Sequence, residues 1–159
     1  MSVDSERAVK CGSPKATEDL GHRLGATARP GDMIAVTGPL GAGKTVLARG
    51  VAAGLGVEGF IPSPSFHICL EHPAHVPLRH VDAYLSDKLG AFLDEGLGDW
   101  LIDGASCVLV EWADRLAGQL PRDRLEVLIH VVGEEERTVS LKALGPVSRR
   151  HLVQALPAP

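Results

Sequence analysis

The sequence is short of cysteine, of long apolar runs and of positive charge, and each shortage excludes a class of protein. The cysteines are Cys11, Cys69 and Cys107, and a scattered, odd set of this kind does not build a disulfide framework. No apolar run reaches the roughly 18 residues that a membrane-spanning helix needs. The first residues lack the basic and apolar regions of a secretion signal. We therefore expect reduced thiols, no membrane partner and a cytoplasmic location.

The formal net charge is −4, whereas a protein that grips RNA by itself normally presents a basic face to the phosphates. The only dense basic segment is Arg149-Arg150-His151. Adjacent basic residues on a terminal helix are usually solvated, so we expect any contact with RNA to be indirect.

The length of 159 residues and an apolar content of 45 % predict one domain with a real core. We expect it to span residues 13–159, after a flexible N-terminal lead-in over residues 1–12. Thr17, followed by acidic residues, resembles the cap of a first helix. Short apolar runs at 33–37 and 106–110 predict buried strands. Further expected elements are a helix at 45–55, extended segments at 66–70 and 78–81, a broken helical region at 88–102, helices beginning at 112 and at 147, and a hairpin of strands 124–131 and 137–143.

Strands that alternate with helices and end in a hairpin predict an α/β fold. Its sheet should be mainly parallel and flanked by helices, with an antiparallel edge hairpin.

A glycine-rich loop separates the strand at 33–37 from the next helix. Gly38-Pro39-Leu40-Gly41-Ala42-Gly43-Lys44-Thr45 satisfies the pattern G-x-x-x-x-G-K-[ST]. In such a P-loop, main-chain N–H groups form a nest for phosphate oxygens, and the helix adds its positive end. The lysine reaches the β- and γ-phosphates, and the threonine hydroxyl binds magnesium. The sequence thus predicts a P-loop NTPase that holds ATP and Mg²⁺ at Pro39, Leu40, Gly41, Ala42, Gly43, Lys44, Thr45 and Val46.

Hydrolysis also needs carboxylates near the magnesium, and two acidic residues end predicted strands. Glu111 follows Cys-Val-Leu-Val, and Asp82 follows Leu-Arg-His-Val. Because ligands bind at the carboxyl edge of an open α/β sheet, we expect both to be catalytic and to bind the metal with Thr45. Composition alone favours core packing for Trp112.

These segments resemble the TsaE (YjeE) family, bacterial ATPases that support threonylcarbamoyladenosine modification of tRNA. The resemblance runs from about Thr17 to the terminal hairpin. It is carried by the P-loop, Ser63-Pro64-Ser65-Phe66, His80-Val81-Asp82-Ala83-Tyr84 and Val110-Glu111-Trp112-Ala113-Asp114-Arg115-Leu116.

The resemblance implies roles for particular residues. Ser65 lies in a switch-like segment that senses the γ-phosphate, and Asp82 is the required acid of an H-x-D-x-Y-R segment. Glu111 is the Walker B acid, Trp112 is needed for function, and Thr17 lies near the nucleotide. Hydrolysis in the family supports a partner tRNA threonylcarbamoyltransferase made of TsaD- and TsaB-like proteins.

The sequence departs from the family pattern at three positions. Ser65 replaces a threonine, His67 replaces a small polar residue, and Leu85 replaces an arginine. Since phosphoryl transfer usually needs a cation, Arg79 or Arg115 would have to take that role. With Leu85 at this position, we expect slow hydrolysis by the isolated protein and reliance on a partner.

Two other functions on the same scaffold have less support. A small-molecule kinase needs a lid rich in cations, but Arg79 and Lys88 are the only Lys or Arg residues between Gly50 and Asp114. A regulatory GTPase would carry an Asn-Lys-x-Asp-like segment, which does not occur. The spacing of His67, Cys69, His72, His75 and His80 does not match a structural zinc site.

Overall fold

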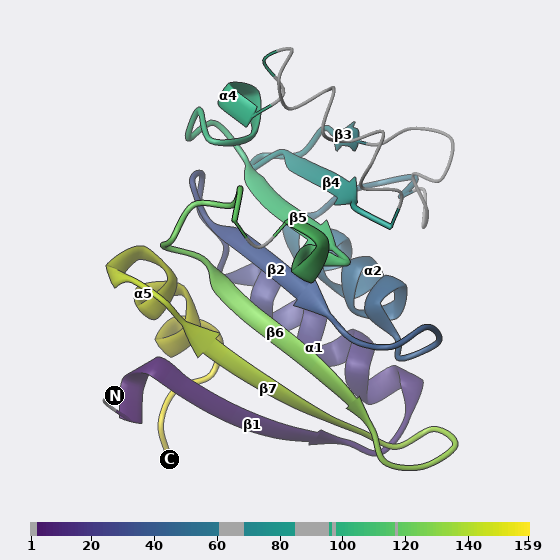
Figure 1. Cartoon of the computed structure of the whole chain (residues 1–159). Helices are drawn as coiled ribbons and strands as arrows, with labels where there is room; N and C mark the ends of the chain where they lie inside the picture. Colours follow the sequence, from purple (N-terminus) through teal and green to yellow (C-terminus); the bar gives the residue numbers. More distant parts are fainter. Residues whose placement is uncertain (1–2, 61–68, 85–95, 97, 117) are drawn as a thin grey trace.

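A computed structural model describes residues 3–60, 69–84, 96, 98–116 and 118–159, and a seven-stranded sheet runs through them (Figure 1). The strand order is β1-β7-β6-β2-β5-β4-β3. The strands are β1 (Glu6–Cys11), β2 (Met33–Thr37), β3 (Cys69–His72), β4 (Leu78–Asp82), β5 (Cys107–Glu111), β6 (Leu125–Val131) and β7 (Arg137–Ala143). The helices are η1 (Val3–Ser5), α1 (Pro14–Ala26), α2 (Lys44–Leu55), α4 (Gly98–Leu101), η3 (Ala113–Leu116) and α5 (Pro146–Ala155).

The centre of the sheet is parallel and both of its edges are antiparallel. β2 pairs in parallel with β5 and β6, and β4 pairs in parallel with β5. The hairpin of β6 and β7 forms one antiparallel edge together with β1, and β3 forms the other. The expected α/β fold is therefore confirmed. The centre is parallel because β2 and β5 are apolar on both faces and need cover on both sides.

Helices α1 and α2 lie together behind the sheet in the view of Figure 1, and their backbones touch. A methyl carbon added at Gly25 would lie 2.1 Å from the carbonyl oxygen of Val51, and one at Gly50 would lie 2.0 Å from that of Glu18. Gly21 and Gly54 are equally tight, at 2.2 Å from carbonyl oxygens of the opposite helix. Glycines four residues apart on each helix thus allow a crossing that no larger residue permits, and this crossing places the start of α2.

The N-terminal region differs from the expectation in two ways. Glu6–Cys11 is an edge strand paired with β7, so the prediction of a flexible lead-in over residues 1–12 is wrong for these residues. Its exposed positions alternate with half-buried ones and include two charged residues, Glu6 and Lys10, so it carries no apolar run that would have predicted a buried strand. The first helix is capped by Ser13, whose hydroxyl accepts a hydrogen bond from the N–H of Ala16, with Pro14 in the first turn. Thr17 is therefore a buried residue of the helix and not its cap.

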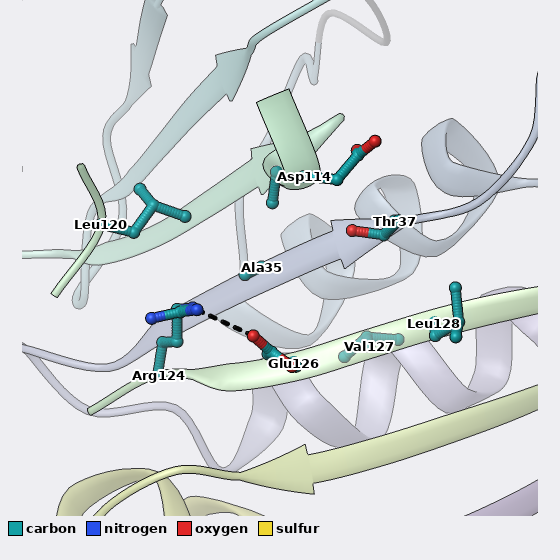
Figure 2. Close-up of a pocket in the computed structure, with 9 residues that line it drawn as sticks. Ala35, Thr37, Asp114, Leu120, Arg124, Glu126, Val127 and Leu128 are labelled. Carbon is teal, nitrogen blue, oxygen red and sulfur yellow. Dashed lines mark hydrogen bonds and ion pairs between the residues drawn. The ribbon is translucent and has the colours of Figure 1, made fainter. Parts of the chain in front are cut away.

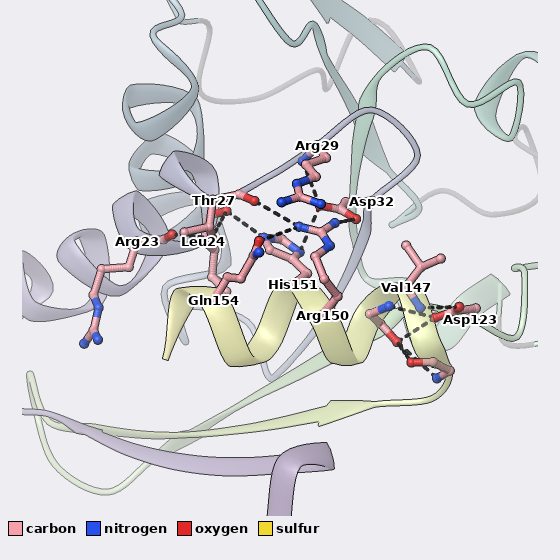
Figure 3. A network of polar contacts seen from close by, with 12 residues as sticks. Arg23, Leu24, Thr27, Arg29, Asp32, Asp123, Val147, Arg150, His151 and Gln154 are labelled. Atoms are coloured by element: carbon pink, nitrogen blue, oxygen red, sulfur yellow. Dashed lines mark hydrogen bonds and ion pairs between the residues drawn. The ribbon is translucent and has the colours of Figure 1, made fainter. Parts of the chain in front are cut away.

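Helix α5 is tied to the turn before β2 by a buried polar cluster (Figure 3). Arg150 pairs with Asp32, whose carboxylate also accepts a hydrogen bond from the N–H of Arg29 at 2.7 Å. His151 is fully buried, and its Nε2 lies 2.7 Å from the carbonyl oxygen of Leu24 on α1. The expectation of a solvated basic segment therefore fails for Arg150 and His151, because an internal carboxylate and a carbonyl bind them.

Other elements agree with the sequence in kind and differ in extent. The expected strand at 66–70 corresponds to β3, and the helix expected from 112 is the short 3₁₀ turn η3. Of the helical region expected at 88–102, α4 is described, and most of the remainder lies outside the described residues. No helix in the described part of the chain is both long and apolar enough to cross a membrane.

Candidate nucleotide site

The glycine-rich loop joins the carboxyl end of β2 to the first turn of α2. Gly41 and Gly43 have φ values of +79° and +108°, a left-handed conformation that costs other residues free energy. The N–H of Ala42 donates to the carbonyl oxygen of Pro39 at 3.0 Å, which closes a turn within the loop. Because α2 begins at Lys44, the N–H groups of its first turn have no acceptor within the helix. They form the positive end that an anion requires.

Lys44 lies across the mouth of this loop. Its ammonium donates to the carbonyl oxygens of Gly38 at 2.7 Å and Pro39 at 2.8 Å, and lies 3.8 Å from the centre of the Trp112 ring. Burial lowers the pKa of Lys44, while the nearby carboxylates of Glu111, Asp114 and Asp82 act to raise it. An ammonium has three N–H donors, so the two carbonyls leave one for another acceptor.

The carboxylates expected at the strand ends lie side by side. Asp82 and Glu111 are partners in the β4–β5 register. One oxygen of Glu111 accepts a hydrogen bond from the Thr45 hydroxyl at 3.0 Å, and the other lies 2.5 Å from Nε2 of His80. Asp82 accepts from the N–H of Tyr84 at 2.9 Å, and burial raises the pKa of Asp82. The hydroxyl and the carboxylates therefore bring hard oxygen donors together beside the loop.

Aromatic rings form the wall opposite the loop. Trp112 has φ +58°, an uncommon conformation for a bulky residue, which follows directly from the end of β5. Its ring centre lies 5.0 Å from that of Tyr84. Arg115 donates to the carbonyl oxygen of Tyr84 at 2.6 Å, and its guanidinium lies 4.8 Å from the Tyr84 ring. The strained backbone turns Trp112 toward Lys44, so this tryptophan faces the site while it also packs against the smaller core cluster.

A pocket of about 440 Å³ opens between the loop and this wall. Its lining brings together most of the residues expected from the sequence: Leu40, Gly41, Gly43, Lys44, Thr45, Val46, Asp82, Tyr84, Glu111 and Trp112.

Other expected site residues lie elsewhere. Pro39 contributes its carbonyl oxygen to Lys44, and Ala42 is fully buried within the loop. Thr17 is buried too, and its methyl group lies 3.8 Å from where a methyl carbon at Gly43 would stand. It therefore supports the loop from α1 and does not line the pocket. Ser65 lies outside the described residues, as do His67 and Leu85.

The two arginines named as substitutes for the missing family arginine have different surroundings. Arg79 donates to Glu71 and Asp103 and stacks 4.1 Å from the Trp100 ring, among residues that do not line the pocket. Arg115 contacts Tyr84 and Trp112, which both line it. Of these two, Arg115 is the cation beside the site.

Sequence reasoning missed two contacts that shape the site. His80 was noted only as part of a motif, yet its ring holds Glu111. Arg137, on β7, donates to the carbonyl oxygen of Ala42 at 2.8 Å. No sequence signal could have found the second contact, because its acceptor is a main-chain atom far away along the chain.

A second hollow of about 250 Å³ lies on the sheet face formed by β2 and β6, beneath η3 (Figure 2). Arg124 and Glu126 on its rim pair with each other at 2.8 Å. Ala35, Val127 and Leu128 supply much of the remaining lining. Because Arg124 is already paired with Glu126, this hollow is less suited to an anionic ligand than the glycine-rich loop is.

Comparison with known proteins gives a consistent result. Residues 11–139 match the family model described as "Threonylcarbamoyl adenosine biosynthesis protein TsaE". A protein from Bacillus subtilis with the name "tRNA threonylcarbamoyladenosine biosynthesis protein TsaE" is 37 % identical over 138 residues, which covers 84 % of this chain and 83 % of the relative. The protein of the same name from Streptomyces coelicolor is 43 % identical over 135 residues, covering 80 % and 90 %. The crystal structure of YdiB from Bacillus subtilis superposes with a TM-score of 0.79 at 32 % identity, covering 94 % of this chain and 93 % of that one.

Proposed function

Because this chain belongs to the TsaE family of tRNA threonylcarbamoyladenosine biosynthesis proteins, we propose that it binds and hydrolyses ATP to support that modification. In this proposal a partner complex of TsaD- and TsaB-like proteins transfers the threonylcarbamoyl group to an adenosine of tRNA. The observation that carries the proposal is the glycine-rich loop between β2 and α2, with Lys44 across its mouth and two carboxylates beside it.

The phosphates of ATP would lie against the loop. The free N–H groups at the start of α2 supply main-chain donors, and Lys44 supplies a mobile cation. In the structure that cation is held by carbonyl oxygens of the loop itself. A phosphate oxygen would be a stronger, charged acceptor for the same ammonium. The buried, desolvated ammonium therefore favours an anionic ligand.

The residues beside the loop fit a magnesium ion. Thr45, Glu111 and Asp82 present oxygen atoms, the donors that magnesium prefers. Among the described residues no three His, Cys, Asp or Glu side chains cluster closely enough to hold a metal by themselves. Two carboxylates and one hydroxyl suit magnesium, which is usually bound by one or two carboxylates together with the phosphates of its nucleotide. When bound, magnesium neutralises charge that develops on the phosphate oxygens.

Hydrolysis needs an acid side chain held in place, and Glu111 meets this need. It is 3 % exposed, and contacts to Thr45 and His80 fix both of its oxygens. Asp82, the neighbouring strand end, is half-buried and would complete the carboxylate pair. Trp112 covers the Lys44 side of the pocket and excludes water there.

Titration calorimetry with ATP and magnesium tests the proposal directly. The wild-type protein should bind Mg·ATP, whereas Lys44→Ala should show no measurable binding because it removes the phosphate cation. Lys142→Ala is a matched control, since Lys142 is exposed on β7 and does not line the pocket. Folded wild-type protein that binds neither ATP nor ADP would overturn the proposal.

A further inference from the structure

Arg137 links the glycine-rich loop to the far end of the sheet. It lies at the start of β7, and its guanidinium donates to the carbonyl oxygen of Ala42 at 2.8 Å and to that of Gly41 at 3.3 Å. These two carbonyls are 95 and 96 positions away in the sequence. The contact is therefore specific to the folded sheet.

The same guanidinium also holds the turn between β6 and β7. It donates to the carbonyl oxygens of Gly133 at 3.0 Å, Glu134 at 3.3 Å and Glu136 at 2.9 Å. Within the described residues, all of the oxygens that accept hydrogen bonds from Arg137 are main-chain carbonyls, and none belongs to a carboxylate. The loop carbonyls accept from Nε and Nη2, and the turn carbonyls accept from Nη1. This spread of donors over a planar fork joins the two segments, and the donors of a lysine, which all radiate from one nitrogen, do not reproduce it.

The contact with Ala42 fixes the direction of a peptide plane. No peptide bond in the described chain is cis, and in a trans peptide the C=O and the following N–H point in opposite directions. Because the carbonyl of Ala42 faces Arg137, the N–H of Gly43 must face away from it. Gly43 lines the pocket and Arg137 does not. The arginine therefore turns a donor of the loop toward the ligand from behind.

Gly43 makes this support necessary. With φ at +108° and no side chain, Gly43 has the wide conformational freedom of glycine, and it has no side chain to hold the peptide that precedes it. The first residues of α2 are ordered by the helix, whereas the peptide between Ala42 and Gly43 precedes it. A hydrogen bond from a side chain outside the loop, here that of Arg137, therefore holds the Ala42–Gly43 peptide plane.

We propose that Arg137 is a positioning residue for phosphate binding, which orients the Ala42–Gly43 peptide so that the loop is organised before the nucleotide arrives. The proposal rests on the proposed function, since it names the residue that shapes the same nucleotide site. Preorganised donors give tighter binding because the ligand does not have to order them.

The test compares the affinities of three variants for Mg·ADP and Mg·ATP by calorimetry. Arg137→Gln should weaken both by about tenfold or more, which corresponds to about 1.4 kcal/mol for each factor of ten. Arg137→Lys keeps the charge but cannot bridge the two segments, so its affinity should fall nearly as far. Arg124→Gln is the matched control, because Arg124 also binds a main-chain carbonyl, that of Pro121 at 2.9 Å, away from the loop. It should bind as the wild type does.

A kinetic split separates positioning from general damage. In the Arg137 variants the KM for ATP should rise while kcat stays within about twofold, because the interaction acts on the loop in both the ground and the transition state. Wild-type affinity in Arg137→Lys would overturn the proposal and show that charge alone matters. Wild-type affinity in Arg137→Gln would overturn it as well. Failure of the wild-type protein to bind nucleotide would instead overturn the proposed function.

Discussion

Glu111 is held on both oxygens, and this is unusual for a side chain that ends a strand. The Thr45 hydroxyl and the His80 ring occupy opposite corners of the carboxylate, and the ring of Phe60 stacks on His80 at 5.6 Å. The carboxylate therefore has little rotational freedom. A fixed carboxylate next to a phosphate loop can act on water without first being ordered.

Replacing Glu111 with Gln should separate binding from hydrolysis. The amide keeps an acceptor for Thr45 but loses the charge, so Mg·ATP affinity should change less than about fivefold, while kcat should fall by about 100-fold or more. Phosphate release with saturating Mg·ATP measures the rate, and calorimetry measures the affinity. Hydrolysis by Glu111→Gln at the wild-type rate would show that another group acts on water.

At the scale of residues, the sequence predicted those that a motif or a strand end marks, and missed those that act through partners far away in the chain. Lys44, Thr45 and Glu111 have a required chemical type at a required spacing, so a single sequence reveals them. His80 and Arg137 act through partners 31 and 95 positions away. The acceptor of Arg137 is a carbonyl that every residue carries, and it leaves no pattern to read.

At the scale of elements, the crossing of α1 and α2 is the feature that sets the position of the loop. The two helices touch through glycines with no layer of side chains between them. The sequence placed α2 to within a residue of its observed start, but it did not predict this contact. Gly50 and Gly54 lay inside the helix expected at 45–55, but no role was assigned to them, and in the structure they allow close approach of two backbones.

Gly50→Ala should therefore destabilise the protein although alanine is the better helix former. The added methyl would stand 2.0 Å from the carbonyl oxygen of Glu18. Overpacking costs about 1–3 kcal/mol, which exceeds or offsets the gain in helix propensity of about 1 kcal/mol. Because the methyl meets a backbone oxygen and not a flexible side chain, we expect the upper end of this cost, and urea denaturation should show a net loss of about 2 kcal/mol. Gly12→Ala, which meets nothing within 4 Å, should stay within about 0.5 kcal/mol of the wild type.

The cluster that ties α5 to the sheet predicts a dependence of stability on pH. Burial lowers the pKa of His151, with Asp32 acting to raise it. The unfolded chain therefore binds more protons than the folded one once the pH falls below about 6.5, the ordinary value for histidine. The free energy of unfolding should decrease as the pH falls from about 6.5 toward the folded pKa, and should be level above about 6.5.

His151→Gln provides the comparison for this prediction. A glutamine amide can still donate to the carbonyl of Leu24, the acceptor of His151 Nε2, but it does not titrate. Urea denaturation from about pH 5 to about pH 8, a range that brackets the ordinary histidine pKa, should show a shallower loss of stability at low pH in the variant. His72, whose pKa burial also lowers, contributes equally to both proteins and cancels. Identical pH profiles would show that His151 is protonated equally in both states.

At the scale of the whole molecule, the candidate site follows from one rule of parallel sheets. β2, β4 and β5 run in the same direction, so the loop after β2 and the acids that end β4 and β5 meet at a single edge. The sequence predicted this meeting because the buried strands were apolar enough to be recognised. It could not predict β1, since polar edge strands carry no such signal.

The whole protein should hydrolyse ATP slowly until its partner is present. Leu85 stands where the resemblance implies an arginine, and Arg115, the alternative cation, stacks on Tyr84 without lining the pocket. Adding the tRNA threonylcarbamoyltransferase should raise kcat by about tenfold or more if it completes the charge around the phosphates. Phosphate release with and without the partner measures this. Lys44→Ala with the same partner is the control for contaminating activity, and rapid turnover by the isolated chain would contradict the prediction.

The crossing of α1 and α2 through their glycines also bears on which parts of the site can move. Because α1 and α2 touch through their backbones, no side-chain rotamer between them can change to make room, and we expect α2 to resist sliding against α1. Among the described residues that line the pocket, we expect adjustment to a nucleotide at the ammonium of Lys44, which can leave its carbonyls, and at the Trp112 ring beside it. Nucleotide binding would then change side chains at the mouth of the pocket and leave the packed helices in place. A partner would sense the bound nucleotide through these surface side chains and not through a movement of the core.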